Sequence, residues 1–292
     1  MSSTKEIKNR IGSVRETQKI TNAMYLISST KMRKAKEELD RTRPYFATLQ
    51  REIRRIFLVD PELDNKYFFP PAEKKFTRDG TCGFLVITAD KGLAGAYNQN
   101  VLNEMMRLSQ KEKDKQYFVV GNYGRNYCRM HHIPIEKSFL YTAQNPTLHR
   151  AREICDELLE RYRSGELRKI YIIFTDFGNG MQAEARSMRL LPLHRADFMD
   201  EDADDIKPFH FVPSLESVLE NLIPGYLVGY IYAALVDSFC SEQNARMTAM
   251  DSANENAEKL LEGLSLEYNH ERQSAITQEI TEISSGARAL RR

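Results

Sequence analysis

A glycine-rich turn with the sequence DKGLAG, at residues 90–95, is the segment of this chain that most resembles a site for chemistry. It follows an apolar run, Phe84–Thr88, and precedes a helical pattern. Backbone N–H groups at the start of a helix attract phosphate. However, the phosphate-loop spacings GxxxxGK[ST] and GxGxxG are both absent, and a tight strand-to-helix turn needs glycine for its backbone alone. A phosphate- or nucleotide-binding enzyme therefore stays open as the alternative function.

The other reactive residue types form no site that the sequence reveals. None of the 6 histidines lies near a serine or cysteine in a known nucleophile motif. The 4 cysteines lack metal-binding spacing, so we expect reduced thiols. The acidic stretch 200–205 lacks the glycine and the distal glutamate of a calcium loop. We expect a non-catalytic protein with no cofactor and no metal.

Composition limits the class of protein further. The chain has 292 residues, of which 41% are hydrophobic and 28% charged, as in folded soluble proteins. No run approaches the ~20 apolar residues of a membrane span, and the first residues lack a signal-peptide core. The net charge of +1 gives no general reason to expect nucleic acid. The basic cluster 31–36 carries no interleaved aromatic residues, so a solvated face or an acidic protein partner is favoured over nucleic acid.

The middle of the chain alternates short apolar runs with helical patterns. Strands are predicted at 84–88, 117–120 and 169–174, with a fourth at the far edge over 186–193, and helices at 98–111, 123–130 and 148–163. This alternation indicates βαβ units and a Rossmann-like, mostly parallel α/β domain. Prolines within 61–71 mark a linker before it.

The two ends of the chain read as very long helices. No proline occurs from Gly225 to Arg292, whereas Pro44 should kink or weaken the N-terminal helix. Residues 1–55 hold 14 basic against 6 acidic residues, and residues 225–292 hold 6 against 10. Roughly 65 helical residues would span about 100 Å, too far for a small domain to cover. We therefore expect an antiparallel coiled coil of the two terminal helices, with the α/β domain inserted between them.

Apolar and small side chains recur along both ends at spacings of three and four, which places them on one stripe of each helix. The N-terminal stripe is predicted to comprise Ile7, Ile11, Val14, Thr21, Met24, Ile27, Met32, Ala35 and Leu39. The C-terminal stripe contains an alanine ladder that would let two helix backbones approach closely: Ala245, Ala249, Ala253 and Ala257. The predicted domains are a coiled-coil helix over 1–58, the α/β domain over 80–195 and a second coiled-coil helix over 212–292.

The termini also carry extended sequence motifs. The segments QKITNAM at 18–24 and KMRKA at 31–35 resemble the N-terminal signature of the gamma subunit of F-type ATP synthases. The segment SEQNARMTAM at 241–250, followed by matching stretches at 256–257, 269–276 and 279–283, resembles the second signature of that family. The turn at 90–95, with Asn98, is similar to the family's first strand-turn-helix unit.

The resemblance implies a rotor shaft without an active site of its own. Its expected partners are three alpha and three beta subunits, an epsilon subunit and the membrane c-ring, with no nucleic acid. The expected location is a peripheral complex on the cytoplasmic face of a bacterial inner membrane. The segment 280–292 would lie in the apolar sleeve of the ring. Contacts with the ring, or between the helices, are expected by family position at Met24, Lys31, Ala245, Arg246, Ala249, Ala253, Ala257, Gln273, Thr277, Ile280 and Ile283. A second alternative, a coiled-coil scaffold or nucleic-acid clamp, does not account for the two signatures.

Overall fold

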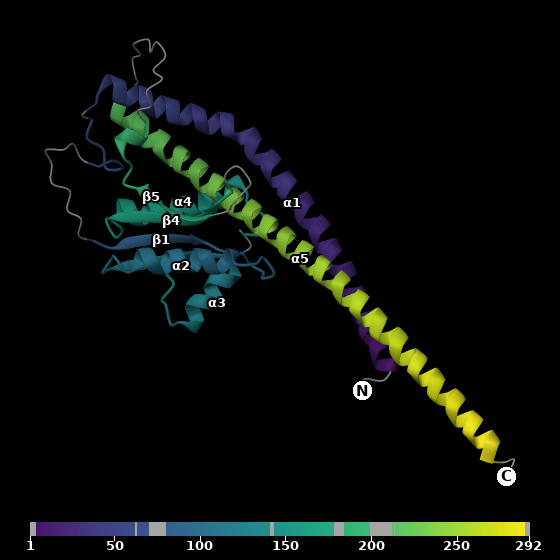
Figure 1. Cartoon of the computed structure of the whole chain (residues 1–292). Helices are drawn as coiled ribbons and strands as arrows, with labels where there is room; N and C mark the ends of the chain where they lie inside the picture. The colour runs from purple at the N-terminus through teal and green to yellow at the C-terminus, as the bar shows by residue number, and fades with distance from the viewer. Residues whose placement is uncertain are drawn as a thin grey trace. The chain divides into compact units, whose positions relative to one another are not determined.

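The structure of the chain is a computed structural model. It describes residues 4–61, 63–69, 80–140, 143–177, 184–198, 212 and 214–289. Figure 1 shows two long helices and a sheet domain. In chain order the elements are α1 (Thr4–Val59), β1 (Cys82–Ile87), α2 (Tyr97–Ser109), β2 (Lys115–Val120), α3 (Asn122–Met130), β3 (Lys137–Phe139), α4 (Leu148–Arg163), β4 (Lys169–Asp176), β5 (Glu184–Leu191), a short 3-10 turn (Arg195–Phe198) and α5 (Leu215–Ala289).

The chain divides into two compact units. The terminal unit comprises residues 1–29 and 246–292, and the sheet unit comprises residues 30–245. Each long helix therefore contributes one part to each unit.

The sheet unit is built on a five-stranded sheet in the order β3-β2-β1-β4-β5. Strands β1, β2, β3 and β4 pair in parallel, while β5 runs antiparallel to β4 at the edge. Every residue of the central strand β1 is buried, as expected for a parallel strand covered on both faces. This confirms the predicted mostly parallel α/β fold.

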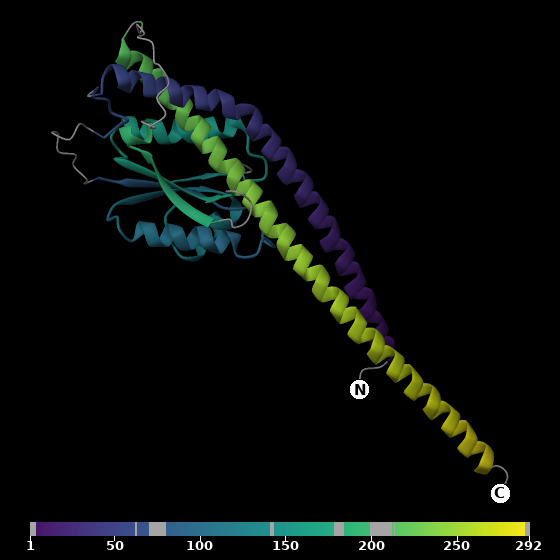
Figure 2. The ribbon, with the colours of Figure 1, turned by 45° about the horizontal axis from the view of Figure 1, so that its top comes forward.

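Helices cover both faces of this sheet (Figure 2). Side chains alternate along the strands, so Leu85 and Ile87 join one core cluster while Phe84 and Val86 join the other. The first and larger cluster contains side chains of α4 and of the sheet-unit parts of α1 and α5, and the second contains those of α2 and α3. The sheet is therefore a filled layer between two layers of helices.

Several local predictions are confirmed, and others need correction. Helix α4 has the predicted bounds, and the Thr147 side chain caps it by accepting from the Arg150 N–H at 3.3 Å. The short strand β3 was missed. Helix α5 begins at Leu215, before Pro224, which lies inside it. Helix α1 also continues through Pro44, as one helix of 56 residues, and the kink expected at Pro44 stays a prediction. At 75 residues α5 is the longer helix, as predicted.

Two predictions fall outside the described part of the chain. The acidic stretch 200–205 and the last residues of the chain, 290–292, both lie there. All four cysteines are described, and each is buried and free of disulfides.

Candidate interaction surface of the terminal helices

A narrow seam joins the two helices in the terminal unit. Thr21 contacts Asn254 through its hydroxyl, and the Gln18 amide donates to the Glu258 carboxylate at 3.4 Å. A higher residue number on α1 thus pairs with a lower residue number on α5, so the two helices run antiparallel. Polar groups at seam positions fix the register of a helix pair more than they add stability.

Burial along α1 in this unit follows a repeat of three and four residues. The less exposed positions are 4, 7, 11, 14, 18, 21, 24, 25, 28 and 29, with Ile7 and Ser28 almost fully covered. This is the 3.5-residue period of a left-handed coiled coil. The predicted stripe was wrong at Ile27, which is 54% exposed, because the seam continues through Tyr25 and Ser28.

Large apolar side chains on the outside of the terminal unit form a second set. On α1 these are Ile20 and Leu26, at 61% and 59% exposure, together with Ile27. On α5, Leu260 and Leu266 are also exposed. Single exposed apolar residues are ordinary, but repeated ones along a thin helix pair are typical of a surface that a partner covers.

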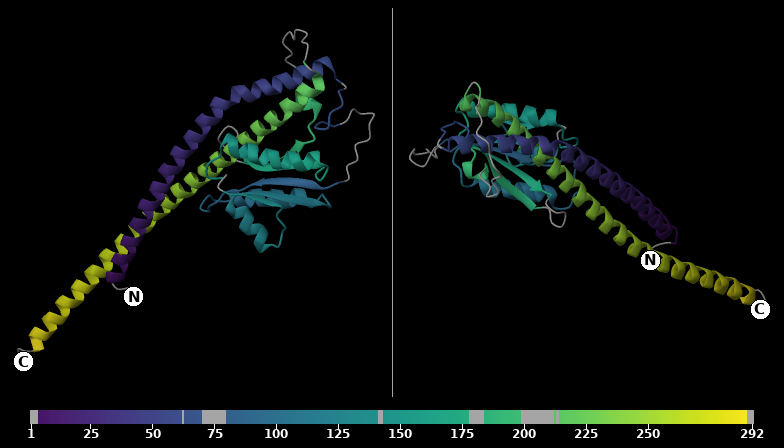
Figure 3. Two further views of the ribbon diagram at one scale, coloured as in Figure 1. Left: turned by 180° about the vertical axis from the view of Figure 1, so that it is seen from behind. Right: turned by 90° about the horizontal axis from the view of Figure 1, so that it is seen from above.

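The last described turns of α5 have no covering layer. All residues from 272 to 287 are exposed, and Figures 1 and 3 show α5 continuing past the N-terminal end of α1. The four C-terminal residues predicted as contacts lie here. Ile280 and Ile283 are 62% and 68% exposed, and the Thr277 hydroxyl donates back to the Gln273 carbonyl at 2.9 Å. Their side chains are therefore available to a partner.

The alanine ladder divides between two surroundings. Ala249, Ala253 and Ala257 are half-buried in the terminal unit. Ala245, in the sheet unit, packs against a small cluster of Ala89, Ala94 and Tyr97. Its contact is therefore with the turn at the end of β1.

The other predicted contact residues also differ in exposure. Met24 is half-buried and Arg246 is only 8% exposed, so neither presents a full side chain to solvent. Lys31 is exposed and lines a cleft of about 220 Å³ in the sheet unit, together with Lys34 and Tyr232.

Glycines allow the closest contact between α1 and α5 in the sheet unit. A Cβ atom added at Gly229 would lie 2.0 Å from Cδ1 of Phe46, and one at Gly225 would lie 3.3 Å from Leu49. The Phe46 ring therefore rests directly on the α5 backbone. These glycines share the four-residue spacing of the alanine ladder, although Asp237 interrupts the series of small side chains between them and Ala245. This close contact was not predicted from the sequence.

The turn at residues 90–95 does not have the geometry of a phosphate site. The Asp90 carboxylate lies at the N-terminus of α3 and accepts from the Asn122 N–H at 2.8 Å. Its second oxygen is covered and has no partner among the described residues. At the start of α2, the Tyr97 N–H already donates to the Ala94 carbonyl. A carboxylate thus occupies the place of an anion and would repel one.

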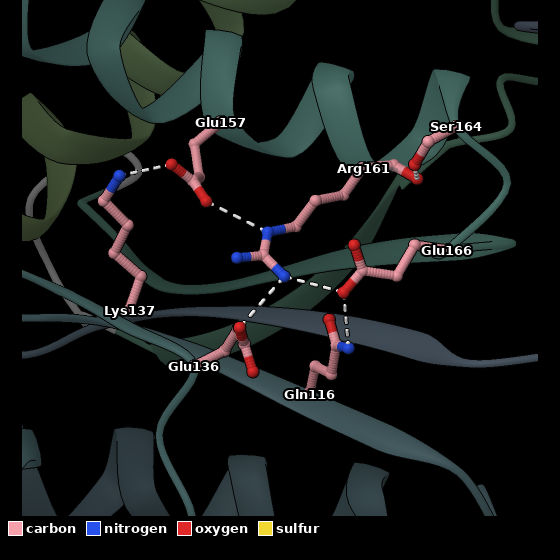
Figure 4. A network of polar contacts seen from close by, with 7 residues as sticks. All are labelled: Gln116, Glu136, Lys137, Glu157, Arg161, Ser164 and Glu166. Carbon is pink, nitrogen blue, oxygen red and sulfur yellow. Dashed lines mark hydrogen bonds and ion pairs between the residues drawn. The ribbon is translucent and has the colours of Figure 1, made fainter.

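A network of charged side chains around Arg161 joins α4 to the sheet (Figure 4). The Arg161 guanidinium contacts Glu136 at 3.0 Å, Glu157 at 3.0 Å and Glu166 at 2.6 Å. Lys137 donates to Glu157 from the other side and holds the pKa of that carboxyl below its usual value. These pairs involve α4, β3 and the neighbouring loops, so their role is to fix the position of α4.

Asp237 is a half-buried acid on α5 with an unusual pKa. Burial raises its pKa to about 6; the nearby Asp176 charge adds to the rise and Arg43 opposes it. Asp176 itself pairs with Arg186 at 2.8 Å. The carboxyl therefore titrates near neutral pH within the packed sheet unit.

Neither a metal cluster nor a clear membrane span emerges from the described residues. Across the described ranges, no three His, Cys, Asp or Glu side chains come together as metal ligands would. Helix α5 is long enough to cross a membrane, and its most apolar 18-residue segment has a mean hydropathy of 1.4. Of this segment, 61% is buried inside the protein, which is also typical of a helix in a protein core.

Chains with this fold occur in solved structures of mitochondrial ATP synthases. One rotor chain of the Euglena gracilis mitochondrial enzyme aligns with 94% of this chain and 98% of its own, at a TM-score of 0.62 and 17% identity. A chain from the central stalk and c-ring structure of the Tetrahymena thermophila enzyme gives a TM-score of 0.58 at 21% identity, over 80% of this chain and 99% of its own. These likenesses show the fold, two long terminal helices with an α/β domain inserted between them.

Sequence comparison gives the family. A family model described as ATP synthase matches residues 3–290. The ATP synthase gamma chain of Caldanaerobacter subterraneus is 41% identical over 97% of this chain and 98% of its own. That of Acetivibrio thermocellus is 39% identical over the full length of both chains, and a sodium-ion-specific gamma chain of Acetobacterium woodii is 35% identical over 98% of each. This chain belongs to the ATP synthase gamma chain family.

Proposed function

We propose that this chain is the central rotor shaft of an F-type ATP synthase, a non-catalytic subunit of a membrane-associated complex. Membership of the gamma chain family supports this function directly. The structural observation that carries it is the end of α5, where residues 272–287 are exposed on every face while Ile276, Ile280 and Ile283 remain apolar. Such a segment is suited to enclosure by other subunits.

The shaft acts by making identical catalytic sites unequal. A ring of three alpha and three beta subunits has no intrinsic reason to hold its sites in different states. An asymmetric shaft contacts each beta subunit differently and shifts the balance between open and closed conformations. Rotation driven by ions crossing the membrane, at about 2.3 kcal/mol per charge per 100 mV, then cycles each site through binding, synthesis and release.

The residues of the two long helices have distinct proposed roles. Ile280 and Ile283, with Gln273 and Thr277, contact the inner surface of the ring, and Lys31 offers a charge to the ring. Contacts between the two helices are made by Ala249, Ala253 and Ala257. The buried Arg246 and the half-buried Met24 also contribute to helix packing. The sheet unit binds the epsilon subunit and the c-ring. We place the complex at the cytoplasmic face of a bacterial inner membrane.

The phosphate-enzyme alternative has little support from the geometry. The turn leads into α2, but the Asp90 carboxylate accepts from the Asn122 N–H at the start of the neighbouring helix α3, and its negative charge opposes an anion beside the turn. Nucleotide titration of the isolated chain is expected to give no tight stoichiometric binding at this turn.

Purification tests the assembly. A tagged chain isolated from gently solubilised native membranes should bring down alpha and beta subunits at three copies each, measured by mass spectrometry. Recovery of the chain alone, or with unrelated enzymes, would contradict the proposal.

Substitution tests the end of α5. Replacing Ile280 and Ile283 together by Glu should leave the fold unchanged, because both side chains are exposed, but should weaken coupling between ATP hydrolysis and ion pumping. The contrasting variant is Leu264→Glu, which places one glutamate at a position that is 4% exposed and should destabilise the terminal unit itself. If the double variant couples normally, the ring does not contact these isoleucines.

A further inference from the structure

A second cleft, in the sheet unit, has a chemistry that the shaft function does not use. It encloses about 340 Å³ and lies where the α4–β4 loop meets the segment after α1. The lining residues are Asp64, Asn65, Lys66, Phe68, Tyr162, Arg163, Gly165, Leu167 and Arg168. The Arg168 N–H donates to the Thr81 carbonyl at 2.9 Å, so the cleft is next to the amino ends of β1 and β4. Asp90 and its turn lie at the opposite, carboxyl end.

Three cationic side chains converge on this cleft from separate segments. Lys66, Arg163 and Arg168 line it, against one acidic lining residue, Asp64. Lys66 is paired with Glu220 at 2.7 Å. Neither arginine has a carboxylate partner among the described residues. The lining is therefore electropositive, and the planar guanidinium groups suit the oxygens of a phosphate.

The two arginines are held in place by contacts that leave their donors available. The Arg163 Nε–H donates to the Tyr67 hydroxyl at 2.7 Å, which leaves its terminal NH2 groups without a described partner. The aliphatic part of Arg168 fills the space beside Gly80, where an added Cβ would lie 2.2 Å from Arg168 Cγ. Gly80 has a positive φ of 143°, so backbone and side chain fit each other only with glycine there.

Asn65 supplies an independent sign of a ligand. Its side chain is only 6% exposed and lines the cleft. The amide oxygen accepts from the Tyr67 N–H at 3.0 Å. The amide NH2 group has no hydrogen-bond partner among the described residues. Because the NH2 group is not enclosed by the surrounding protein, it reaches the cleft, where water or a ligand can accept from it.

We propose that this cleft binds a phosphate-bearing anion, with the Asn65 amide and the Arg163 and Arg168 guanidinium groups as donors. Buried aromatic and aliphatic groups, Phe68 and Leu167, form part of its lining, and they exclude water beneath the anion and strengthen the charge-assisted bonds. The volume accommodates one small phosphate compound or one phospholipid headgroup. Both sources present the same phosphate oxygens.

Calorimetric titration of the full-length chain with inorganic phosphate and with pyrophosphate tests the site. We expect saturable binding at one site per chain. Asn65→Asp should weaken it by about tenfold or more, because the acid keeps the acceptor for the Tyr67 N–H but replaces the donor with a negative charge. Arg168→Gln should weaken phosphate binding by a similar factor. Arg129→Gln is the matched control, since Arg129 is exposed on α3 and its loss changes the net charge equally.

The outcomes separate a built site from general attraction. Binding that all variants share, or that Arg129→Gln weakens as much as Arg168→Gln, overturns the proposal. Flotation with vesicles of phosphatidylcholine and anionic phosphatidylglycerol distinguishes the sources. If vesicles bind through Arg168 while the free anions do not, the ligand is a lipid headgroup; if no probe binds saturably, there is no site. Thermal melts followed by circular dichroism verify that each variant folds. If Asn65→Asp does not fold, Arg168→Gln still tests the site.

Discussion

The contact between Gly229 and Phe46 makes the packing of α5 on α1 directly testable. Replacing a helical glycine by alanine stabilises an exposed helix by about 1 kcal/mol, through backbone entropy and helix propensity. At Gly229 the new methyl group would lie 2.0 Å from Phe46 Cδ1, and two further ring atoms lie within 2.5 Å. Overpacking of this kind costs about 1–3 kcal/mol. The net change in the free energy of unfolding should therefore be a loss of up to about 2 kcal/mol.

A control variant uses the same helix. An added Cβ at Gly263 meets nothing within 4 Å, so Gly263→Ala should stabilise the chain by the full propensity of about 1 kcal/mol. Urea denaturation of the full-length chain, followed by far-UV circular dichroism, gives both values. The difference between the two variants isolates the steric cost at Gly229 and should be about 1–3 kcal/mol.

A double-mutant cycle identifies Phe46 as the cause. When Phe46→Ala removes the ring, adding Gly229→Ala should be stabilising, because the methyl group then enters the space that the ring has left. If Gly229→Ala stabilises the wild-type chain as much as Gly263→Ala does, the ring does not rest on the α5 backbone and the reasoning is refuted.

Two further predictions concern the sheet unit. Asp237 has a pKa raised from 3.8 to about 6 in the folded chain, so the cost of its charge is absent well below pH 3.8, grows between about pH 4 and pH 6, and is complete above about pH 6. Asp237→Asn should therefore increase stability by about 1–3 kcal/mol at pH 7.5 and by far less at about pH 3, where the carboxyl is largely protonated in both states. An equal gain at both pH values in thermal melts would exclude the titration. Gly121 has a φ of 93°, and an added Cβ would lie 2.2 Å from the Thr88 carbonyl oxygen, so Gly121→Ala should lower the free energy of unfolding by at least about 2 kcal/mol. Gly165→Ala should lower it by less, because φ is also positive there (80°) but the space is open. Equal losses in urea denaturation would show that only backbone strain matters.

Elements with strong local signals were predictable from sequence. Helix α4 combines an N-cap threonine with a regular apolar stripe, and its bounds were predicted correctly. The buried strands β1 and β4 are continuous apolar runs, which parallel strands between two helix layers require. Strand β3 was missed because three residues, Lys137–Phe139, are too few to show a period.

The seam of the terminal unit was harder to predict for a physical reason. Hydrophobicity alone assigns Ile27 to the inside, but the helix pair buries Ser28 and half-buries Gln18 instead. Thr21, which the predicted stripe included, is half-buried as well. Hydrogen bonds across the pair, such as that from Gln18 to Glu258, compensate those polar groups. Apolar residues such as Ile20 then remain outside. The hydrophobic pattern placed Ile27 on the stripe although that side chain is exposed, and it left Ile20 outside.

The basic cleft lay beyond sequence analysis. Asn65 and Arg163 are separated by nearly a hundred residues and belong to a linker and a helix end, neither of which carries a motif. Only the folded loops bring them together. The terminal signatures, in contrast, identified the family without any knowledge of the fold.

The uneven thickness of the terminal unit has a mechanical consequence. Over residues 246–271 α5 has positions covered within its own chain, whereas from 272 to 287 every position is exposed. Two rods joined end to end carry the same torque, and the thinner one twists through the larger angle. When the isolated chain is twisted, most of the elastic twist would therefore occur in the segment 272–287, which is more compliant than residues 246–271.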